Sequence, residues 1–314
     1  MIHKIILPTP FAVGDVNAYL MKGDSLTLVD AGTNTEEALF ALRKGIDEAG
    51  YKMEDVEQVI LTHHHPDHAG LIDYFPNAEL FGHSYNQVWL EKEEAFFNYH
   101  DDFYTKCLLE EGVPTEYLKW VKMMRRPIHL IGNRKLDSFL KENDDVPGLP
   151  GYKVIETLGH AQSHISFWNE KEGILIGGDH ILAKISSNPL IEPPLPIGSP
   201  RPKSMLQYNA SLKKVQLLDV QKVYAGHGEE VEEVSSLIAY RLERQRERAL
   251  KVLEMVKEGK KTVYQLTQQL FPKVYEKELG LTLSETIGQL DYLIDEQLIR
   301  EQRDERGILY YEVC

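Results

Sequence analysis

The sequence lacks the features of disulfide-bonded, exported and membrane-spanning proteins. It has 2 cysteines, Cys107 and Cys314, so it cannot form a disulfide framework, and a reducing, cytoplasmic setting is expected. No stretch approaches the roughly 20 consecutive apolar residues of a membrane helix. The first residues lack the apolar core and the cleavage site of a secretory signal peptide. We therefore expect no association with a membrane.

Positive charge is also scarce. The chain carries 35 Lys and Arg against 49 Asp and Glu, a formal net charge of -14 at pH 7. This balance disfavours non-specific attraction to nucleic acid or anionic membranes. It describes only the average surface, since a centre with two divalent ions would be strongly positive locally. A length of 314 residues suggests two domains, or one large domain with an appendage.

The most informative stretch is Thr62 to His68, which reads Thr-His-His-His-Pro-Asp-His. It follows an apolar run, 59–61, that predicts a buried strand. It offers four candidate metal ligands on one loop: His63, His65, Asp67 and His68. On an extended backbone, residues two apart point the same way, so the first two can bind one metal. A bend at Pro66 lets the last two reach a second metal. Imidazole and carboxylate are the usual ligands of zinc-like ions.

Three later strands are each expected to end in glycine and then a side chain that can bind metal: Gly159-His160, Gly178-Asp179 and Gly226-His227. Each pair alone is a weak signal, because such dipeptides usually mark plain turns. Glycine lets the backbone turn tightly and approach an ion. Loops at the ends of rigid strands commonly carry catalytic groups. Together with the first cluster, the pattern favours a metal centre.

Strand and helix patterns alternate through the first 230 residues, which predicts an α/β layer architecture. We expect strands at 4–7, 17–21, 26–29, 56–61, 79–81, 153–157, 164–168, 173–176 and 222–225, and helices at 35–49 and 203–218. Aromatic and charged residues mix over about 85–141, which predicts a helical insertion. Several prolines in 186–202 predict a long irregular loop.

A small cationic cluster lies within the predicted insertion and consists of Lys122, Arg125 and Arg126. It either binds an anionic substrate group or forms a solvated helix end.

These motifs resemble those of the metallo-β-lactamase-fold hydrolase superfamily over about residues 1–230. The resemblance rests on the Thr-His-x-His-x-Asp-His run, on His160, Asp179 and His227, and on the early Asp30-Ala31-Gly32 turn. It implies a four-layer αβ/βα sandwich with two metals at one edge. It also implies two ligand sets bridged by Asp179: His63, His65 and His160 for one metal, and Asp67, His68 and His227 for the other. His64, His164 and His180 lie outside the pattern, and His164 is expected to be structural or to support a ligand.

A pair of divalent ions would lower the pKa of a shared water and supply a bridging hydroxide nucleophile. Asp67 would be a ligand and would also orient that water or accept its proton. The sequence thus predicts hydrolysis of an ester-like bond (thioester, ester or lactone) or of a phosphodiester. The nitrogen-rich ligand set favours zinc, with manganese or iron as alternatives.

Residues 231–314 predict a linker helix at 231–257, helices at 262–270 and 284–296, and a β-hairpin at 298–313. This order resembles the small winged helix that follows the catalytic unit in lactamase-β-like protein 2 and its bacterial relatives. The human-type relative is a single-strand-specific endoribonuclease. The resemblance therefore makes single-stranded RNA the alternative substrate to a small ester-like molecule.

The charge of this tail argues against binding to duplex DNA. Residues 240–314 hold 13 Lys and Arg against 14 Asp and Glu. The expected recognition helix carries four acidic residues: Glu285, Asp291, Asp295 and Glu296. A reader of the major groove needs positive charge to contact phosphates. We expect the tail to pack on the catalytic domain or to mediate homodimerisation. A regulatory module with a vestigial hydrolase and an exported β-lactamase are the less favoured hypotheses.

Overall fold

The computed structural model describes all residues, 1–314, and the chain forms two compact units. The first unit comprises 1–93, 127–187 and 211–238, and the second comprises 94–126, 188–210 and 239–314. The sequence suggested one boundary near residue 230 and an insertion that belongs to the catalytic domain. Instead, residues 94–126 join the tail, because apolar side chains of both segments, such as Tyr104 and Leu283, share one core.

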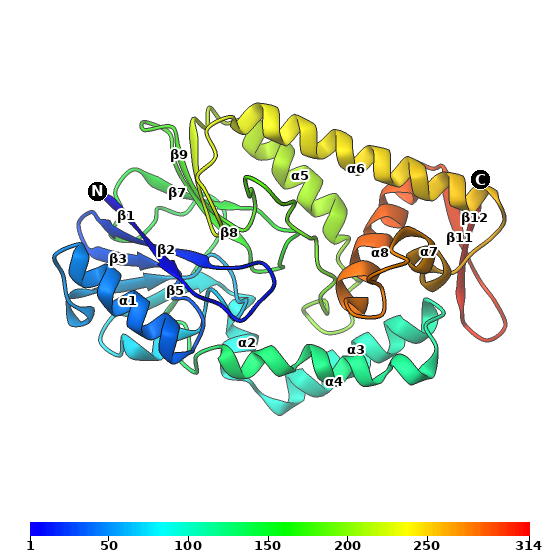
Figure 1. Cartoon of the computed structure of the whole chain (residues 1–314), viewed down its shortest axis with the longest axis horizontal. Coiled ribbons are helices and arrows are strands. Elements are labelled where there is room, and N and C mark those ends of the chain that lie inside the picture. Colours follow the sequence, from blue (N-terminus) through cyan, green and yellow to red (C-terminus); the bar gives the residue numbers. More distant parts are fainter. The chain divides into compact units, whose positions relative to one another are not determined.

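The first unit contains two sheets. The larger has the spatial order β1-β2-β3-β4-β5-β6: β1 (Ile2–Leu7), β2 (Val16–Lys22), β3 (Leu26–Val29), β4 (Gln58–Ile60), β5 (Glu79–His83) and β6 (Ser138–Leu140). The smaller has the order β10-β9-β8-β7: β7 (Tyr152–Glu156), β8 (Ile165–Asn169), β9 (Ile174–Gly178) and β10 (Lys222–Ala225). β3 to β6 run parallel to one another, as do β9 and β10, whereas the other neighbours are antiparallel. In Figure 1, β1, β2, β3 and β5 lie next to one another beside α1.

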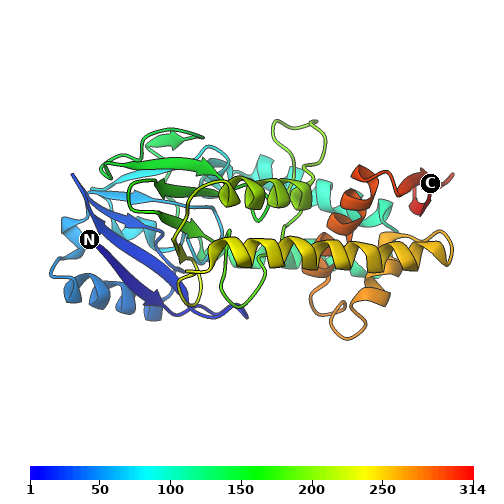
Figure 2. The same cartoon turned by 90° about the horizontal axis from the view of Figure 1, so that it is seen from above.

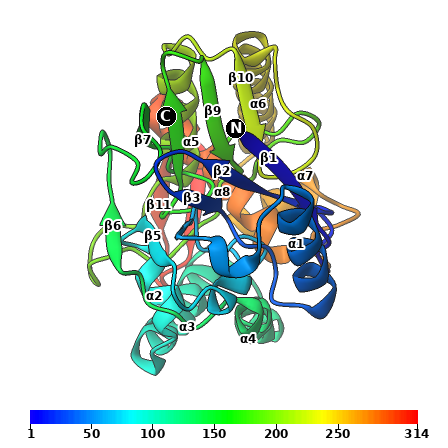
Figure 3. The same ribbon diagram turned by 90° about the vertical axis from the view of Figure 1, so that its left-hand side faces the viewer.

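Apolar side chains from both sheets meet in a shared core. The larger sheet contributes Tyr19, Val29, Ile60 and Phe81, and the smaller contributes Val154, Ile165, Phe167 and Ile176. On the outside, α1 (Glu36–Glu48) packs against β1 and buries Ala38, Leu42 and Ile46. In Figure 3, β7, β9 and β10 lie above the strands of the larger sheet and α1 lies below β1. The expected αβ/βα layering is confirmed.

The remaining helices complete the description of the chain. They are α2 (Asn86–Glu91), α3 (Glu94–Glu110), α4 (Lys119–Met124), α5 (Ser204–Gln216), α6 (Val234–Lys257), α7 (Val263–Leu270) and α8 (Leu279–Asp295). Four short 3₁₀ helices lie at Met53–Asp55, Leu71–Tyr74, Thr115–Tyr117 and Arg126–Leu130. None of these helices combines the length and the apolar character that crossing a membrane requires.

In the second unit, α7 and α8 pack beside the C-terminal half of α6, which is yellow in Figure 2. Thr262 caps α7, since its hydroxyl accepts from the backbone N–H of Gln265. The antiparallel strands β11 (Ile299–Arg303) and β12 (Leu309–Val313) follow α8, so the expected order of two helices and a hairpin is present. α8 buries both apolar and polar residues along most of its length.

Two elements differ from the sequence expectation. β6 lies within the stretch expected to be helical. It is an edge strand of three residues with Phe139 exposed, too short for a two-residue alternation to be evident. α8 begins at Leu279, five residues before the expected start at Ser284. Ser284 and the acid that follows it resembled a helix start, but buried Leu279 and Leu283 extend the apolar face of the helix toward the N-terminus.

A buried carboxyl group lies in the core of the second unit. Glu111 follows α3, is 5% exposed, and accepts hydrogen bonds of 3.1 and 3.2 Å from the hydroxyl of Tyr311 on β12. Burial raises the pKa of Glu111 from 4.5 to about 8, although the hydroxyl of Tyr311 partly opposes this shift. Between these two pH values the unfolded chain is ionised at Glu111 while the folded chain is not. Stability should therefore fall as the pH rises from 4.5 to 8.

We predict that Glu111→Gln stabilises the protein above pH 8 and has little effect near pH 5. Glutamine keeps an acceptor for Tyr311 without a charge to bury, and the gain at about pH 8.5 should be roughly 4–5 kcal/mol. Urea unfolding at both pH values measures it. The neighbouring Glu110→Gln, which loses only partly exposed ion pairs with Arg303 and Lys106, should change stability by less than about 1 kcal/mol at both pH values. Equal effects of Glu111→Gln at the two pH values would contradict this account.

Candidate metal centre

All seven predicted ligands gather at one place in the first unit. They follow the ends of three strands and the turn between β7 and β8: His63, His65, Asp67 and His68 after β4, His160 before β8, Asp179 after β9 and His227 after β10. In one group, Nδ1 of His65 lies 3.0 Å from Nε2 of His63 and 3.0 Å from Nε2 of His160. In another, Nε2 of His227 lies 3.3 Å from Oδ2 of Asp67, with His68 beside them.

Asp179 lies between the two groups. Its Oδ1 is 3.3 Å from Nε2 of His68, and its Oδ2 is 3.5 Å from Nε2 of His160 and 3.4 Å from Nε2 of His227. One carboxylate thus faces a histidine of the first group and two histidines of the second. This is the place that the family resemblance assigns to a bridging ligand.

Groups behind the cluster fix the orientation of two imidazoles. Asp30 accepts from the backbone N–H and the hydroxyl of Thr62, both at 2.8 Å, and from Nδ1 of His68 at 2.8 Å. Because the hydroxyl of Thr62 donates to Asp30, it must accept from Nδ1 of His63, 3.0 Å away. In both histidines the proton is therefore on Nδ1, which leaves the lone pair of Nε2 facing the cluster.

The other two rings that present Nε2 are held in a similar way. Nδ1 of His227 donates to the backbone carbonyl of Asp15 at 2.8 Å. Nδ1 of His160 lies 2.8 Å from the hydroxyl of Ser187, which is itself buried. Partners of this kind set the tautomer of a metal-binding histidine and raise its basicity. Their positions in the chain gave no sequence signal, and the sequence analysis did not identify them.

Three buried atoms of the cluster have no hydrogen-bond partner: Nε2 of His68, Nε2 of His227 and Oδ1 of Asp179. Buried polar atoms are rarely left unpaired, because their desolvation is then uncompensated. Lone pairs that converge on one another without a donor call for a cation. Ligands about 2.0–2.1 Å from a tetrahedral zinc lie about 3.3–3.4 Å apart, close to the separations of 3.0–3.5 Å in the cluster. The residues fit divalent ions.

The electrostatics of the cluster also favour a cation. Burial lowers the pKa of His227, but the carboxylate of Asp179 outweighs it and raises that pKa to about 10. Burial likewise opposes the charging of His68, whose pKa is nevertheless raised well above its usual value, first by Asp179 and then by Asp30. Burial would raise the pKa of Asp179 itself, yet His227 and His68 hold it well below its usual range. Each group thus stabilises the charge of the other.

His63 and His65, in the other group, stay neutral. Burial, and then the neighbouring imidazoles, lower the pKa of His63 and of His65 well below the usual value. A neutral imidazole has the free lone pair that a metal requires. The cluster therefore combines neutral nitrogen ligands on one side with a carboxylate-rich side that attracts positive charge.

Two glycines permit the close packing of this centre. A Cβ atom on Gly226 would lie 2.2 Å from Oδ1 of Asp179. Gly178 has a φ of +48°, and its Cβ would lie 2.8 Å from Nε2 of His164. Side chains at either position would displace Asp179 or the residue that holds it. This explains why glycine precedes both His227 and Asp179.

The other histidines of these segments have supporting roles. Nε2 of His164 accepts from the backbone N–H of Asp179 at 3.0 Å, and its Nδ1 lies 2.7 Å from the hydroxyl of Thr157. His164 therefore fixes the main chain of Asp179. His64 stacks on Trp89, with ring centroids 4.4 Å apart, and its Nδ1 lies 2.8 Å from the hydroxyl of Ser163. His180 is fully buried, and burial lowers its pKa to about 3.

The predicted cationic group is partly neutralised within the second unit. Arg125 forms a 3.0 Å ion pair with Asp101, and its guanidinium lies 4.6 Å above the ring of Phe97. The carboxylate of Asp101 neutralises the charge of this arginine, and the ring of Phe97 makes a cation–π contact with the face of its guanidinium. They favour the structural interpretation of Arg125 over an anion-binding one.

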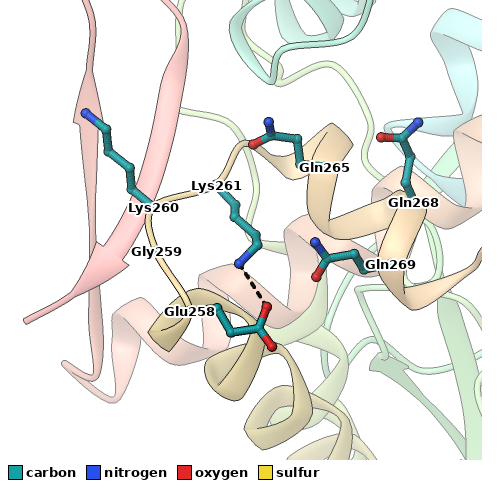
Figure 4. Close-up of a pocket in the computed structure, with 7 residues that line it drawn as sticks. All are labelled: Glu258, Gly259, Lys260, Lys261, Gln265, Gln268 and Gln269. Atoms are coloured by element: carbon teal, nitrogen blue, oxygen red, sulfur yellow. Dashed lines mark hydrogen bonds and ion pairs between the residues drawn. The ribbon is translucent and has the colours of Figure 1, made fainter.

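A surface hollow of the second unit offers no comparable chemistry (Figure 4). It is lined by Glu258, Gly259, Lys260, Lys261, Gln265, Gln268 and Gln269. Lys261 points toward Glu258, 3.3 Å away, and also donates to the carbonyl of Met255. Lys260 lies 5.3 Å from the centre of the Tyr310 ring. Because both lysines already contact protein groups, this hollow is not preorganised for an anionic ligand.

We predict that Asp30→Ala weakens both zinc-binding steps, whereas Ser187→Ala weakens only the step that uses His160. Asp30 supports His68 directly and His63 through Thr62, and these two histidines belong to different ligand sets. Ser187 supports His160 alone, and loss of such a partner typically costs roughly 10–100-fold in metal affinity. Two-step zinc titration with a chromophoric chelator measures both steps. Equal losses at both steps for Ser187→Ala would contradict the assignment of separate ligand sets.

Comparisons with known proteins agree with this geometry. The family model described as the metallo-beta-lactamase superfamily matches residues 12–227. The probable metallo-hydrolase YqjP of Bacillus subtilis (strain 168) is 46% identical over 296 residues, which cover 94% of this chain and 92% of that protein. The beta-lactamase-like protein 2 homolog of Caenorhabditis elegans is 26% identical over 271 residues, which cover 84% and 73%.

The fold is also found among solved structures. The crystal structure of the metallo-beta-lactamase family protein TTHA1429 from Thermus thermophilus superposes with a TM-score of 0.80 and 26% identity, covering 100% of this chain and 98% of that one. A beta-lactamase domain protein from Burkholderia ambifaria gives a TM-score of 0.81 at 20% identity, covering 100% and 92%. The chain therefore belongs to the metallo-beta-lactamase superfamily, as a metallo-hydrolase whose histidine and aspartate cluster can hold divalent metal ions.

Proposed function

We propose that the protein uses two zinc ions to hydrolyse an ester-like bond (thioester, ester or lactone) in a small or medium-sized substrate. The observation that carries this proposal is the convergence of seven side chains around buried, unpaired atoms of His68, Asp179 and His227. Five of the seven are imidazoles, which favours zinc over magnesium or calcium. His63, His65 and His160 would hold one ion, and Asp67, His68 and His227 the other, with Asp179 shared.

When bound, such ions lower the pKa of a coordinated water and polarise the bond under attack. The residues of the chain supply position and proton transfer. Asp67 is 7% exposed and contacts one imidazole, whereas Asp179 contacts three. Asp67 thus has an oxygen available to orient the attacking water and accept its proton. Asp179 is committed to joining the two ligand sets.

The surroundings of the cluster favour a carboxylic ester-like substrate over a polyanion. The segments that carry the seven side chains, 62–68, 159–164, 177–181 and 225–228, contain no lysine or arginine. Contacts with phosphates depend on such residues, and the formal net charge of -14 disfavours long-range attraction of a polyanion. The same argument leads us to propose that duplex DNA is not a ligand of the tail, where α8 is buried along most of its length.

We predict that Asp67→Asn lowers kcat by at least about 100-fold, because an amide cannot accept the proton of the attacking water. A panel of thioesters, lactones and nitrocefin, assayed with the zinc-loaded protein, measures this effect. Asp73→Asn is the matched control, since Asp73 lies outside the cluster and hydrogen-bonds Asn133. It should keep activity within about twofold of wild type. Stoichiometric zinc without turnover of any substrate in the panel would contradict the proposed function.

Cleavage of single-stranded RNA is the second candidate. Two observations favour it. The chain matches the beta-lactamase-like protein 2 homolog of Caenorhabditis elegans over 84% of its length, and the order of elements in residues 231–314 resembles the tail of that family. Incubation with a single-stranded oligoribonucleotide separates the two candidates. If the RNA is cleaved only with zinc and Asp67→Asn abolishes the cleavage, the substrate is RNA and not an ester-like molecule. If cleavage persists after metal removal, it comes from another activity.

A further inference from the structure

The C-terminal hairpin has one strand edge that no other segment pairs with. β11 and β12 form a two-stranded sheet. The far edge of β12 is partly occupied, because Lys261 and Tyr311 exchange backbone hydrogen bonds of 2.9 and 3.2 Å. The far edge of β11 has no such partner, and every residue of β11 after Ile299 is exposed. An open strand edge is a template for pairing with another chain unless its side chains prevent it.

The backbone groups of Glu301 and Arg303 point to this open edge. Asp304 donates its N–H to the carbonyl of Ile308 across the hairpin, so the even-numbered residues of this strand direct their backbone groups toward β12. Backbone groups alternate in direction along an antiparallel strand, and those of the odd-numbered residues therefore face outward. The N–H and C=O groups of both residues are thus available to a further strand.

Side chains along this edge are complementary to a second copy of themselves. Residues 300–304 read Arg-Glu-Gln-Arg-Asp. With Gln302 opposite its own copy in an antiparallel pair, Glu301 faces Arg303 of the second copy. Arg300 then faces Asp304. Opposite charges that face each other across two strands are stabilising, and like charges are destabilising. A symmetric register centred on either neighbour of Gln302, or on Arg300, places a charge opposite its own copy.

The same register also matches the backbone. It pairs Glu301 with Arg303, the two residues whose backbone groups face outward, and such a pair exchanges two hydrogen bonds. A two-fold axis generates this pair twice, so about four backbone hydrogen bonds join the strands. Gln302 lies on the axis in a non-hydrogen-bonded pair, where facing side chains are close. Charge and backbone geometry therefore select one register independently.

Contacts within the chain leave these side chains able to bind a second copy. Arg300 contacts Glu312 through Nε and Nη2, and Arg303 uses only Nη1 for its contacts. A guanidinium has five N–H donors, so both arginines retain donors for a further carboxylate. Their side chains are 61% and 48% exposed. Glu301 is exposed and forms no ion pair within the chain.

We propose that the open edge of β11 pairs with the β11 edge of a second copy of this chain, in an antiparallel two-fold register centred on Gln302. The two hairpins then form one continuous sheet, and the tail acts as a dimerisation module. A contact of this size belongs to the small, transient class of interfaces, so we expect a Kd on the order of 100 μM at low ionic strength.

Sedimentation velocity of the full-length chain, from about 5 to about 500 μM, measures the association. Glu301→Arg and Arg303→Glu each place like charges opposite each other and should weaken the dimer by at least about tenfold. An equimolar mixture of the two variants should restore it, because each arginine of one chain then faces a glutamate of the other. Arg244→Glu is the matched control. It changes the net charge as Arg303→Glu does and also loses an exposed ion pair, with Glu247, but it lies on α6, so the dimer should be unaffected.

Disulfide trapping in a Cys314→Ser background tests the register. Gln302→Cys places two thiols at the two-fold axis, where the Cα atoms of a non-hydrogen-bonded pair lie about 4.5 Å apart, within the range of a disulfide. The two copies of Arg300→Cys would lie roughly 14 Å apart in this register. Mild oxidation should therefore yield cross-linked dimer from Gln302→Cys and not from Arg300→Cys.

Several results would overturn the inference. A sedimentation coefficient that is independent of concentration would show that the chain does not associate. A dimer that both charge reversals leave intact, or that their mixture does not restore, would place the contact on another surface. Equal cross-linking of Gln302→Cys and Arg300→Cys would refute the register. None of these measurements involves metal or substrate, so their outcome is separate from that of the proposed function.

Discussion

The structure of the first unit depends on the burial of a carboxylate, Asp179, among imidazoles. Three histidine nitrogens lie 3.3–3.5 Å from its oxygens, and the lone pairs of neighbouring ligands face the same space. A protein interior does not tolerate such a group of acceptors without a compensating positive charge. Protons on His68 and His227 can supply that charge, and divalent ions can supply more of it. The cluster therefore has the chemistry of a site that can hold divalent cations.

The fold meets this requirement with two sheets that share one apolar core. Strand ends from both sheets bring the seven side chains together. Groups behind four of the five imidazoles (Asp30, Thr62, Ser187 and the carbonyl of Asp15) hold the rings of His63, His68, His160 and His227 with Nε2 facing inward. Rigid strands and fixed tautomers preorganise the centre, so little reorganisation is needed when ions and substrate bind.

The sequence predicted which seven side chains lie together better than it predicted the groups behind them. The seven side chains carry local signals, a dense His/Asp run and three Gly-His or Gly-Asp pairs at strand ends, and the structure brings all seven together. β6 was missed because a three-residue edge strand has no periodicity to detect. The division into units was missed because it depends on which apolar helix faces meet, as for Tyr104 and Leu283. The pairing of Arg201 with Asp291 joins residues far apart in the chain, and nothing local in the sequence marks it.

The most direct test of the central claim is anomalous X-ray diffraction from crystals grown with excess zinc or manganese. The account predicts two peaks in the first unit, one beside His63, His65 and His160 and the other beside Asp67, His68 and His227, with Asp179 in contact with both. Diffraction data that show no anomalous peak between His65 and His227 would contradict it.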